Sequence, residues 1–219
     1  MTIRNIWAVG RNYRDHVSEM NAPTPSVPVV FLKAGSSATV FSNEIVLPHW
    51  TEEVHHEVEL ALKLGPSLQV IEGAVALDLT ERKLQAEAKK RGGPWTLAKS
   101  FDGACPVSAS FTLRHVSEAA DFRIRLWVND ELRQEGRTRD MIFNCQYLLE
   151  YVQTYFPICA GDLILTGTPA GVGPLRDGDR VKAEIEGQIT HIWKVIKATN
   201  TRGGFAAHAD KDEDSGDEH

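Results

Sequence analysis

Two glutamates separated by a single residue, Glu57 and Glu59, form the first group whose spacing could support chemistry. They lie in the segment 54–64, whose apolar residues alternate with period two and predict a strand. The alternation places both carboxylates on one face of that strand, about 6.6 Å apart along it. Two anions ~5 Å apart in a partly buried site repel by about 3 kcal/mol, so the pair needs a proton or a cation. The alternative is a solvated strand face on which Lys63 supplies part of the counter-charge.

A metal ion at this pair needs a third oxygen ligand, and Asp78 is the candidate. Asp78 follows an expected strand over 70–77 and precedes an expected helix over 79–91. Carboxylate ligands favour a hard divalent ion such as Mg²⁺, Mn²⁺ or Ca²⁺ over zinc. Asp78 also fits a helix N-cap, with Glu81 three residues later as its capping-box partner. The pattern alone leaves ligand and N-cap as equal alternatives.

His16 and Glu19 form a second group. A short helix expected over 14–20, ended by Asn21 and a proline-rich run, places these two residues three apart on one face. In that arrangement the carboxylate orients the imidazole and raises its basicity, as a pair that activates water requires. The alternative is a surface helix that carries an incidental pair.

Two further pieces could contact an anionic ligand. Lys99 follows the glycine-rich turn 92–95, and it is either a solvent-facing lysine or a binder of an oxyanion or carboxylate. The small residues of 166–174 follow an expected buried strand and fit neither a Walker loop nor a dinucleotide fingerprint. They form a plain turn, or a loop whose backbone N–H groups and Thr168 hydroxyl face an anion.

The chain that must position these residues is dominated by strand patterns. Helical patterns are fewer and cover 14–20, 79–91 and 145–155. Because strands and helices do not alternate along the chain, we expect a β-rich α+β fold with packed antiparallel sheets. The expected strands cover 6–9, 29–32, 54–64, 70–77, 124–128, 163–165, 181–185 and 189–195.

Composition limits the class of protein. The chain has 219 residues, 42% of them hydrophobic and 25% charged, which is typical of a globular protein. No repeat or linker divides residues 1–200, so we expect a single domain there. Residues 202–219 carry two basic and six acidic side chains, so we expect a disordered acidic tail over 201–219. The body is left close to neutral without a basic stripe, which argues against a nucleic-acid partner.

The sequence also indicates a compartment. It contains no run of about 18 apolar residues, the length that a membrane helix requires. Its N-terminus, MTIRNIWAVG, enters a strand pattern at once, so we expect no leader and a cytoplasmic protein that does not bind membranes. The cysteines are odd in number and lack a CxxC spacing, and we expect them to be reduced and buried: Cys105, Cys145 and Cys159.

Five segments, taken in order, resemble the fumarylacetoacetate hydrolase family: GRNYRDH, HHEVELAL, DLTERKLQ, PWTLAKSFD and LTGTPAGVG. The resemblance covers about 6–197. The segments PWTLAKSF, CPVS, LRQEG and MIF are similar to the acylpyruvase branch, whose members cleave acylpyruvates and are also described as oxaloacetate decarboxylases or tautomerases. The resemblance implies a mixed β-sandwich roll forming a single catalytic domain, a homodimer, and a bound Mg²⁺ or Mn²⁺.

The resemblance also implies roles for individual residues. Glu57, Glu59 and Asp78 match the metal-binding carboxylates, and His16 with Glu19 matches a catalytic dyad on a lid helix. In the mechanism that we expect, Lys99 is also catalytic, because it would stabilise the developing oxyanion. The positions that match the lining of the substrate pocket are Arg82, Gln85, Lys99 and Thr168.

The chain departs from the family pattern at two positions. Ala34 stands where a proline often follows the motif lysine, here Lys33, and Glu81 replaces a common small residue. Neither departure removes a metal ligand, so both bear on substrate preference.

The expected activity is metal-dependent hydrolysis of the C–C bond of a small 2-oxo acid, such as acetylpyruvate or fumarylpyruvate, to pyruvate and a carboxylic acid. His16 would activate the water, with Glu19 holding the imidazole. Decarboxylation or tautomerisation of oxaloacetate could use the same site. Two alternatives stay open: an isomerase or decarboxylase of hydroxy-dienoate diacids, and a metal-binding protein without catalysis.

Overall fold

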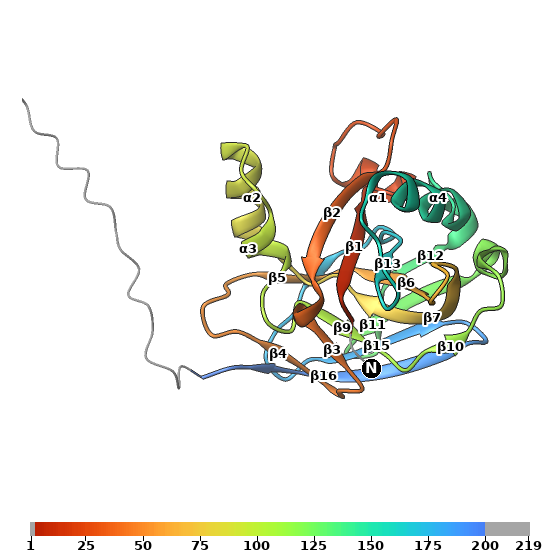
Figure 1. The fold of residues 1–219 in the computed structure, drawn as a ribbon. Helices are drawn as coiled ribbons and strands as arrows, with labels where there is room; N and C mark the ends of the chain where they lie inside the picture. The colour runs from red at the N-terminus through yellow and green to blue at the C-terminus, as the bar shows by residue number, and fades with distance from the viewer. Residues whose placement is uncertain (1–2, 200–219) are drawn as a thin grey trace, which may run out of the picture.

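The largest element of the fold is an eight-stranded sheet in a computed structural model that describes residues 3–199 (Figure 1). Most neighbouring strands are antiparallel, but β1 pairs with β13, and β3 with β9, in parallel. β10 (Phe111–Thr112) pairs with β7 beside this path. The spatial order is β2 (Val29–Ala34), β1 (Asn5–Gly10), β13 (Leu163–Leu165), β6 (Val58–Leu64), β7 (Val70–Leu77), β9 (Cys105–Val107) and β3 (Ala38–Val40).

Two smaller sheets contain the remaining strands of the described residues. The first has five strands in the order β12 (Glu131–Arg137), β11 (Arg123–Val128), β15 (Arg180–Ile185), β16 (Ile189–Lys197) and β4 (Glu44–Leu47). Its β16–β4 pair is parallel. The second has three short strands in the order β14 (Gly173–Pro174), β5 (Val54–His56) and β8 (Thr80–Glu81). The β-rich α+β prediction is confirmed, but parallel pairs interrupt the sheets that we expected to be antiparallel throughout.

The main core lies between the eight-stranded and five-stranded sheets. β6 and β7 pack against β11, β15 and β16. The even-numbered residues of β6 are buried in this core, as their alternation predicts. On the opposite face of β6, Ala61 joins a second, smaller apolar cluster. One strand is therefore buried on both faces, and any carboxylate at its end is enclosed by protein.

The strand expected over 54–64 is interrupted at Glu57. Residues before the break form β5 and pair with β8 and β14, whereas those after it form β6 in the large sheet. At the break, the Glu57 carbonyl accepts a hydrogen bond from Asp78 N at 2.8 Å. The prediction of one continuous strand was wrong, because β5 leaves the large sheet to form a separate ladder.

Within residues 3–199, four α-helices flank the sheets: α1 (Arg14–Glu19), α2 (Arg82–Arg91), α3 (Thr96–Lys99) and α4 (Cys145–Tyr155). Helix α4 has the predicted bounds, and the side chain of Asn144 accepts a hydrogen bond from Tyr147 N as its N-cap. Figure 1 shows α2 and α3 beside β2, apart from α1 and α4. Short 3₁₀ turns occupy Gly35–Ser37, Val116–Asp121 and Thr138–Asp140.

Helix α2 begins three residues later than expected, and this changes the role of Asp78. The backbone over 79–81 stays extended, with Leu79 N donating to Ala104 O at 3.0 Å. Glu81 is the N-cap, and its carboxylate accepts from Leu84 N at 2.6 Å and from Glu53 N at 3.0 Å. The N-cap interpretation of Asp78 was therefore wrong. Glu81, where the family often has a small residue, has a structural role here, because its carboxylate caps the N-terminus of α2.

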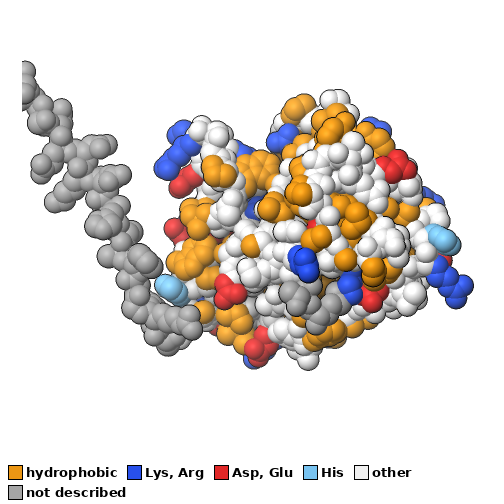
Figure 2. All heavy atoms as spheres, viewed as in Figure 1, with side chains coloured by type: hydrophobic (Ala, Val, Ile, Leu, Met, Phe, Trp, Pro, Cys, Tyr) orange, Lys and Arg blue, Asp and Glu red, His pale blue; other side chains and the backbone are white. Residues whose placement is uncertain are grey.

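The surface and the thiols can be compared with what composition suggested. In residues 3–199 no helix is long and apolar enough to cross a membrane. Lys and Arg side chains on the face shown in Figure 2 are scattered among acidic and apolar ones. Cys105 and Cys145 are buried as expected, and burial raises the pKa of each thiol to about 12. The expectation of burial was wrong for Cys159, which is partly exposed. The expected acidic tail, 201–219, lies outside the described residues.

Candidate active site

Three carboxylates meet where β6 and β7 run antiparallel. Val58 pairs with Leu77, so the residues just beyond this pair, Glu57 and Asp78, become neighbours, and Glu59 lies one position further along β6. One oxygen from each of these three side chains lies within 4.8 Å of the others. All three are buried, with at most 5% of each residue exposed. The structure thus brings together the three residues that the sequence singled out as metal ligands.

Cations neutralise two of these carboxylates. Lys99 Nζ lies 2.8 Å from Glu57 Oε2 and 2.5 Å from Asp78 Oδ2. Lys33, which is fully buried, donates to Asp78 Oδ1 at 2.5 Å and to Ala104 O at 2.9 Å. Arg82 Nη1 lies 3.2 Å from Glu57 Oε1. Buried charges need such partners because desolvation costs several kcal/mol per ion.

Of the three carboxylates, Glu59 is the one that forms no ion pair with any residue of the described part of the chain. It accepts one backbone hydrogen bond, from Gly167 N at 2.6 Å. Burial raises the pKa of Glu59 well above its usual value, and the charges of Asp78 and Glu57 raise it further. Burial also opposes ionisation of Glu57, but Lys99 and Arg82 outweigh it and lower the pKa of Glu57 to about 2. The three cations all contact Glu57 or Asp78 rather than Glu59, and a hard divalent cation fits the three oxygen donors of the cluster.

His16 and Glu19 form the predicted hydrogen-bonded pair. His16 Nδ1 lies 3.0 Å from Glu19 Oε2, so Nδ1 carries the proton and donates it to the carboxylate. The other carboxylate oxygen of Glu19 accepts from Gly171 N at 3.1 Å, which ties α1 to the loop after β13. His16 is buried, and within residues 3–199 its Nε2 makes no hydrogen bond to the protein.

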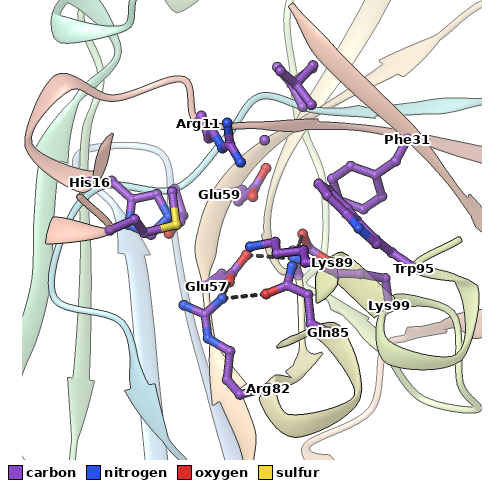
Figure 3. A pocket seen from close by; sticks show the side chains of 16 residues that line it. Arg11, His16, Phe31, Glu57, Glu59, Arg82, Gln85, Lys89, Trp95 and Lys99 are labelled. Carbon is purple, nitrogen blue, oxygen red and sulfur yellow. Dashed lines mark hydrogen bonds and ion pairs between the residues drawn. The ribbon is translucent and has the colours of Figure 1, made fainter. Parts of the chain in front are cut away.

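One pocket joins the carboxylates and His16. In Figure 3, His16 lies on one side, Phe31 and Trp95 lie on the other, and Glu57 and Glu59 lie between them. All the site residues expected from the sequence except Glu19 line this pocket: His16, Glu57, Glu59, Asp78, Arg82, Gln85, Lys99 and Thr168.

Helix α2 supplies one polar wall. Arg82 Nη1 donates to Gln85 Oε1 at 2.9 Å, and Arg82 Nε donates to His55 Nδ1 at 3.3 Å. These bonds, with the ion pair to Glu57, hold the guanidinium in place beside the carboxylates. The aromatic wall opposite His16 is formed by Phe31 and Trp95, whose ring centroids are 5.6 Å apart.

The loop after β13 reaches the pocket through a tight backbone path. Gly167 has a φ of 98°, and a Cβ atom there would lie 2.6 Å from Asn12 Cβ. Asn12 is fully buried and donates from Nδ2 to Thr166 O at 2.7 Å and to Phe143 O at 2.9 Å. Glycine is therefore required at 167 to bring the Thr168 hydroxyl and the Gly167 N–H to the site.

Gln134 couples this loop to the break between β5 and β6. Its Oε1 accepts from His56 Nδ1 at 2.9 Å and from Val58 N at 3.1 Å. Its Nε2 donates to Thr168 Oγ1 and to Pro169 O, each at 2.8 Å. No role was predicted for Gln134, Asn12 or Arg11, although each lies within a segment that resembles the family. The groups around these residues lie far away in the sequence, so the spacing of residues along the chain could not predict the contacts.

Replacing Gln134 with alanine is expected to lower the free energy of unfolding by about 3 kcal/mol or more, because several buried polar groups lose their partners. Urea unfolding of the parent and of Gln134→Ala measures this. Gln146→Ala, on the exposed face of α4, is the matched control and should change stability little. A loss below about 1 kcal/mol would contradict this role of Gln134.

His56 should make folding sensitive to mild acid. Burial lowers its pKa from 6.5 to about 4, and Nδ1 donates to Gln134. The unfolded chain therefore binds a proton as the pH falls below 6.5, whereas the folded chain does not until about pH 4. Stability due to His56 is present above pH 6.5 and is lost as the pH falls, by about 2 kcal/mol between pH 7 and pH 5.

NMR titration of the imidazole together with unfolding at both pH values checks this, with His56→Gln as the reference. The raised pKa of Glu59 has the opposite effect, because it makes stability fall as the pH rises. Glu59 is present in both proteins, so its contribution cancels in the comparison. An imidazole that titrates near 6.5 in the folded protein would contradict the expectation.

Comparison with known proteins places these features in context. Residues 5–196 match the family model for the fumarylacetoacetate (FAA) hydrolase C-terminal domain. Mitochondrial oxaloacetate tautomerase FAHD1 of Bos taurus is 43% identical over 202 residues, which cover 88% of this chain and 91% of the relative.

Solved structures agree with this fold. Fumarylpyruvate hydrolase of Pseudomonas aeruginosa, in complex with Mn²⁺ and pyruvate, has a TM-score of 0.84 at 29% identity, covering 90% of this chain and 91% of that one. The 2-hydroxyhepta-2,4-diene-1,7-dioate isomerase of Mycobacterium marinum has a TM-score of 0.76 at 32% identity, covering 90% of this chain and 76% of that one.

Proposed function

Because the chain belongs to the fumarylacetoacetate hydrolase family, we propose that it is a metal-dependent enzyme that hydrolyses the C–C bond of 2,4-dioxo acids to pyruvate and a carboxylic acid. The observation that carries the proposal is one pocket with the three buried carboxylates beside the His16–Glu19 pair. A metal-binding protein without catalysis would have no chemical use for that pair.

Glu57, Glu59 and Asp78 would hold Mg²⁺ or Mn²⁺. Bound there, the ion would supply positive charge that orients a 2-oxo carboxylate and stabilises the enolate of the leaving pyruvate. The oxygen-only donor set supports these hard ions, and the Pseudomonas relative was solved with Mn²⁺ and pyruvate. Gly167 N–H and the neighbouring loop fix Glu59 for this role.

His16 acts as the general base in this proposal. Its Nε2 takes a proton from water as the hydroxide oxygen bonds to the distal carbonyl carbon. The bond between that carbon and C3 then breaks, and its electron pair passes into the C2–C3 enolate. The imidazolium returns its proton to C3, which gives pyruvate and a free carboxylic acid. Glu19 holds the Nδ1 proton and stabilises the imidazolium between these steps.

Lys99 would stabilise negative charge on the substrate oxygens, and Arg82, Gln85 and Thr168 would bind and orient the substrate. Lys99 is suited to this because its ammonium is already desolvated and held by two carboxylates. Burial opposes its charge, but Asp78 and Glu57 raise the pKa of Lys99 above its usual value. Lys99 therefore stays protonated at neutral pH.

The same residues could serve oxaloacetate. Loss of CO₂ from its C4 carboxylate leaves the same pyruvate enolate, and tautomerisation moves a proton at C3. The name of the bovine relative supports activity on oxaloacetate. An isomerase of hydroxy-dienoate diacids is the other candidate, which the Mycobacterium relative supports.

Steady-state turnover tests the proposal. We expect Mg²⁺-dependent hydrolysis of acetylpyruvate or fumarylpyruvate that EDTA abolishes, with pyruvate as a product. Assays on oxaloacetate and on hydroxy-dienoate diacids rank the alternatives by kcat/KM. A metal-loaded protein that converts none of these acids would contradict the proposal.

Two expectations outside the site stay predictions. The homodimer that the resemblance implies can be checked by light scattering of the purified chain. The cytoplasmic location can be checked by fractionation, which matters because the bovine relative is mitochondrial.

A further inference from the structure

The positive charges in the pocket exceed those that its own carboxylates neutralise. Lys33, Lys99 and Arg82 are paired with Glu57 and Asp78. Two further cations, Arg11 and Lys89, line the same pocket. Within residues 3–199, neither forms an ion pair or a hydrogen bond with a carboxylate. A bound divalent ion would add two more positive charges to the inner part of the pocket.

Arg11 enters the pocket from the turn between β1 and α1. Its φ is 61°, in the left-handed region that non-glycine residues seldom adopt. The residue is partly buried, and its side chain lies above the carboxylates in Figure 3. A residue in this region is strained and persists only where the surrounding structure fixes it.

Lys89 enters from α2, on a different wall. Its Nζ lies 5.4 Å from the centroid of the Trp95 ring. Lys89 is exposed at the edge of the pocket, where partial desolvation lowers its pKa, and the charges of Arg82, Arg11 and Lys99 lower it further. Arg11 and Lys89 line the same pocket, so an anion bound between them would offset the repulsion of their like charges. In Figure 3, both side chains reach into the space in front of Glu57 and Glu59.

We propose that Arg11 and Lys89 form a subsite for a second carboxylate, so that the enzyme prefers 2-oxo diacids to 2-oxo monoacids. This inference rests on the proposed function, in which the first carboxylate and the 2-keto oxygen bind at the metal centre. The distal carboxylate then contacts two cations that have no other anionic partner. The carbon chain between the two carboxylates lies against the apolar wall that Phe31 and Trp95 form.

The chemistry of the two cations favours a carboxylate over a neutral group. A guanidinium binds a carboxylate through two parallel N–H bonds, and an ammonium adds a point charge. Charge-assisted hydrogen bonds of this kind contribute roughly 10- to 100-fold in affinity. The subsite therefore selects among substrates without taking part in bond cleavage, and Arg11 and Lys89 are specificity residues.

Calorimetric binding of two acids that lack a 2,4-dioxo group tests the subsite. The probes are 2-oxoglutarate and 2-oxopentanoate, which share chain length and differ only in the distal carboxylate. With Mg²⁺ present, we expect the parent to bind 2-oxoglutarate roughly 10-fold or more tightly than 2-oxopentanoate. Arg11→Gln and Lys89→Gln should each lower that ratio several-fold, and the double variant should bring it close to one.

Two matched variants control for loss of surface charge. Lys90→Gln lies next to Lys89 on α2, and Arg14→Gln lies on α1; both residues are exposed and outside the pocket lining. Neither should change the affinity ratio by more than about twofold. Glutamine at position 11 has no greater difficulty with the positive φ than arginine, because both are unbranched at Cβ.

The outcomes separate this inference from the proposed function. Mg²⁺-dependent binding of both acids with equal affinity would overturn the subsite and leave the metal centre intact. A preference for 2-oxoglutarate that persists in the double variant would also overturn it. Binding of 2-oxoglutarate that requires Arg11 and Lys89 but not Mg²⁺ would support the subsite and contradict the metal-dependent function.

Discussion

The Glu59→Gln protein is expected to be more stable than the parent in EDTA and to lose at least ~10³-fold of its Mg²⁺-dependent turnover. Of the three carboxylates, Glu59 forms no ion pair within the described residues, and its charge is repelled by Asp78 and Glu57. A glutamine oxygen can still accept from Gly167 N, so the hydrogen bond is kept while the charge is removed. The stability gain should be about 1–3 kcal/mol at pH 8, where the carboxylate is most strongly driven to ionise.

Thermal melts with and without Mg²⁺, together with turnover of acetylpyruvate, measure both effects. The melting temperature of the parent should rise with Mg²⁺ because the ion binds only the folded state, and that of Glu59→Gln should not. Glu87→Gln, on the exposed side of α2, controls for removal of an acidic group and should keep turnover and the Mg²⁺ response. Turnover by Glu59→Gln within tenfold of the parent would contradict Glu59 as a metal ligand.

Replacing His16 with alanine is expected to separate hydrolysis from decarboxylation. Hydrolysis needs a water molecule that loses its proton to His16, so kcat should fall by roughly 10²–10⁴-fold. Decarboxylation of oxaloacetate needs a site that accepts negative charge and no activated water, so it should fall much less. Glu19→Gln keeps a hydrogen-bond acceptor for Nδ1 but lacks the charge that stabilises the imidazolium, and it should lose less than His16→Ala.

The two activities are measured on the same preparations, as acetylpyruvate consumption and as CO₂ release from oxaloacetate. Tautomerisation of oxaloacetate gives a third comparison, and it should follow hydrolysis because it also requires proton transfer. An equal loss of hydrolysis and decarboxylation in His16→Ala would show that His16 does not act as a base for water. It would then support a role of His16 in binding or in holding the pocket together.

Local patterns predicted the elements that depend mainly on neighbouring residues. The bounds of α4, β7 and β13 match, because alternation or helical periodicity and the residues that end these elements are all local. The pairing of Glu57 with Glu59 on one strand face was also predictable from spacing. By contrast, the interruption at Glu57 depends on β5 joining β8 and β14, and no local pattern encodes that choice.

The partners of the site residues were the least predictable part. Asp78 reaches the glutamates because β6 and β7 pair in one particular register. Lys33 lies on β2, and the alternation of residues along this strand does not reveal its partner. Its side chain is fully buried and donates a hydrogen bond to Asp78. Gln134 lies on a largely exposed strand yet connects His56 and Thr168. Such contacts depend on tertiary register, which a single sequence does not reveal.

Crystals of this protein soaked with Mn²⁺ would test the central claim most directly, through the anomalous scattering of the ion. We predict one strong anomalous peak within coordination distance, about 2.0–2.3 Å, of carboxylate oxygens from Glu57, Glu59 and Asp78. The peak should disappear in crystals of Glu59→Gln. Full Mn²⁺ occupancy at another site, with no density among these three side chains, would contradict the metal centre and the chemistry built on it.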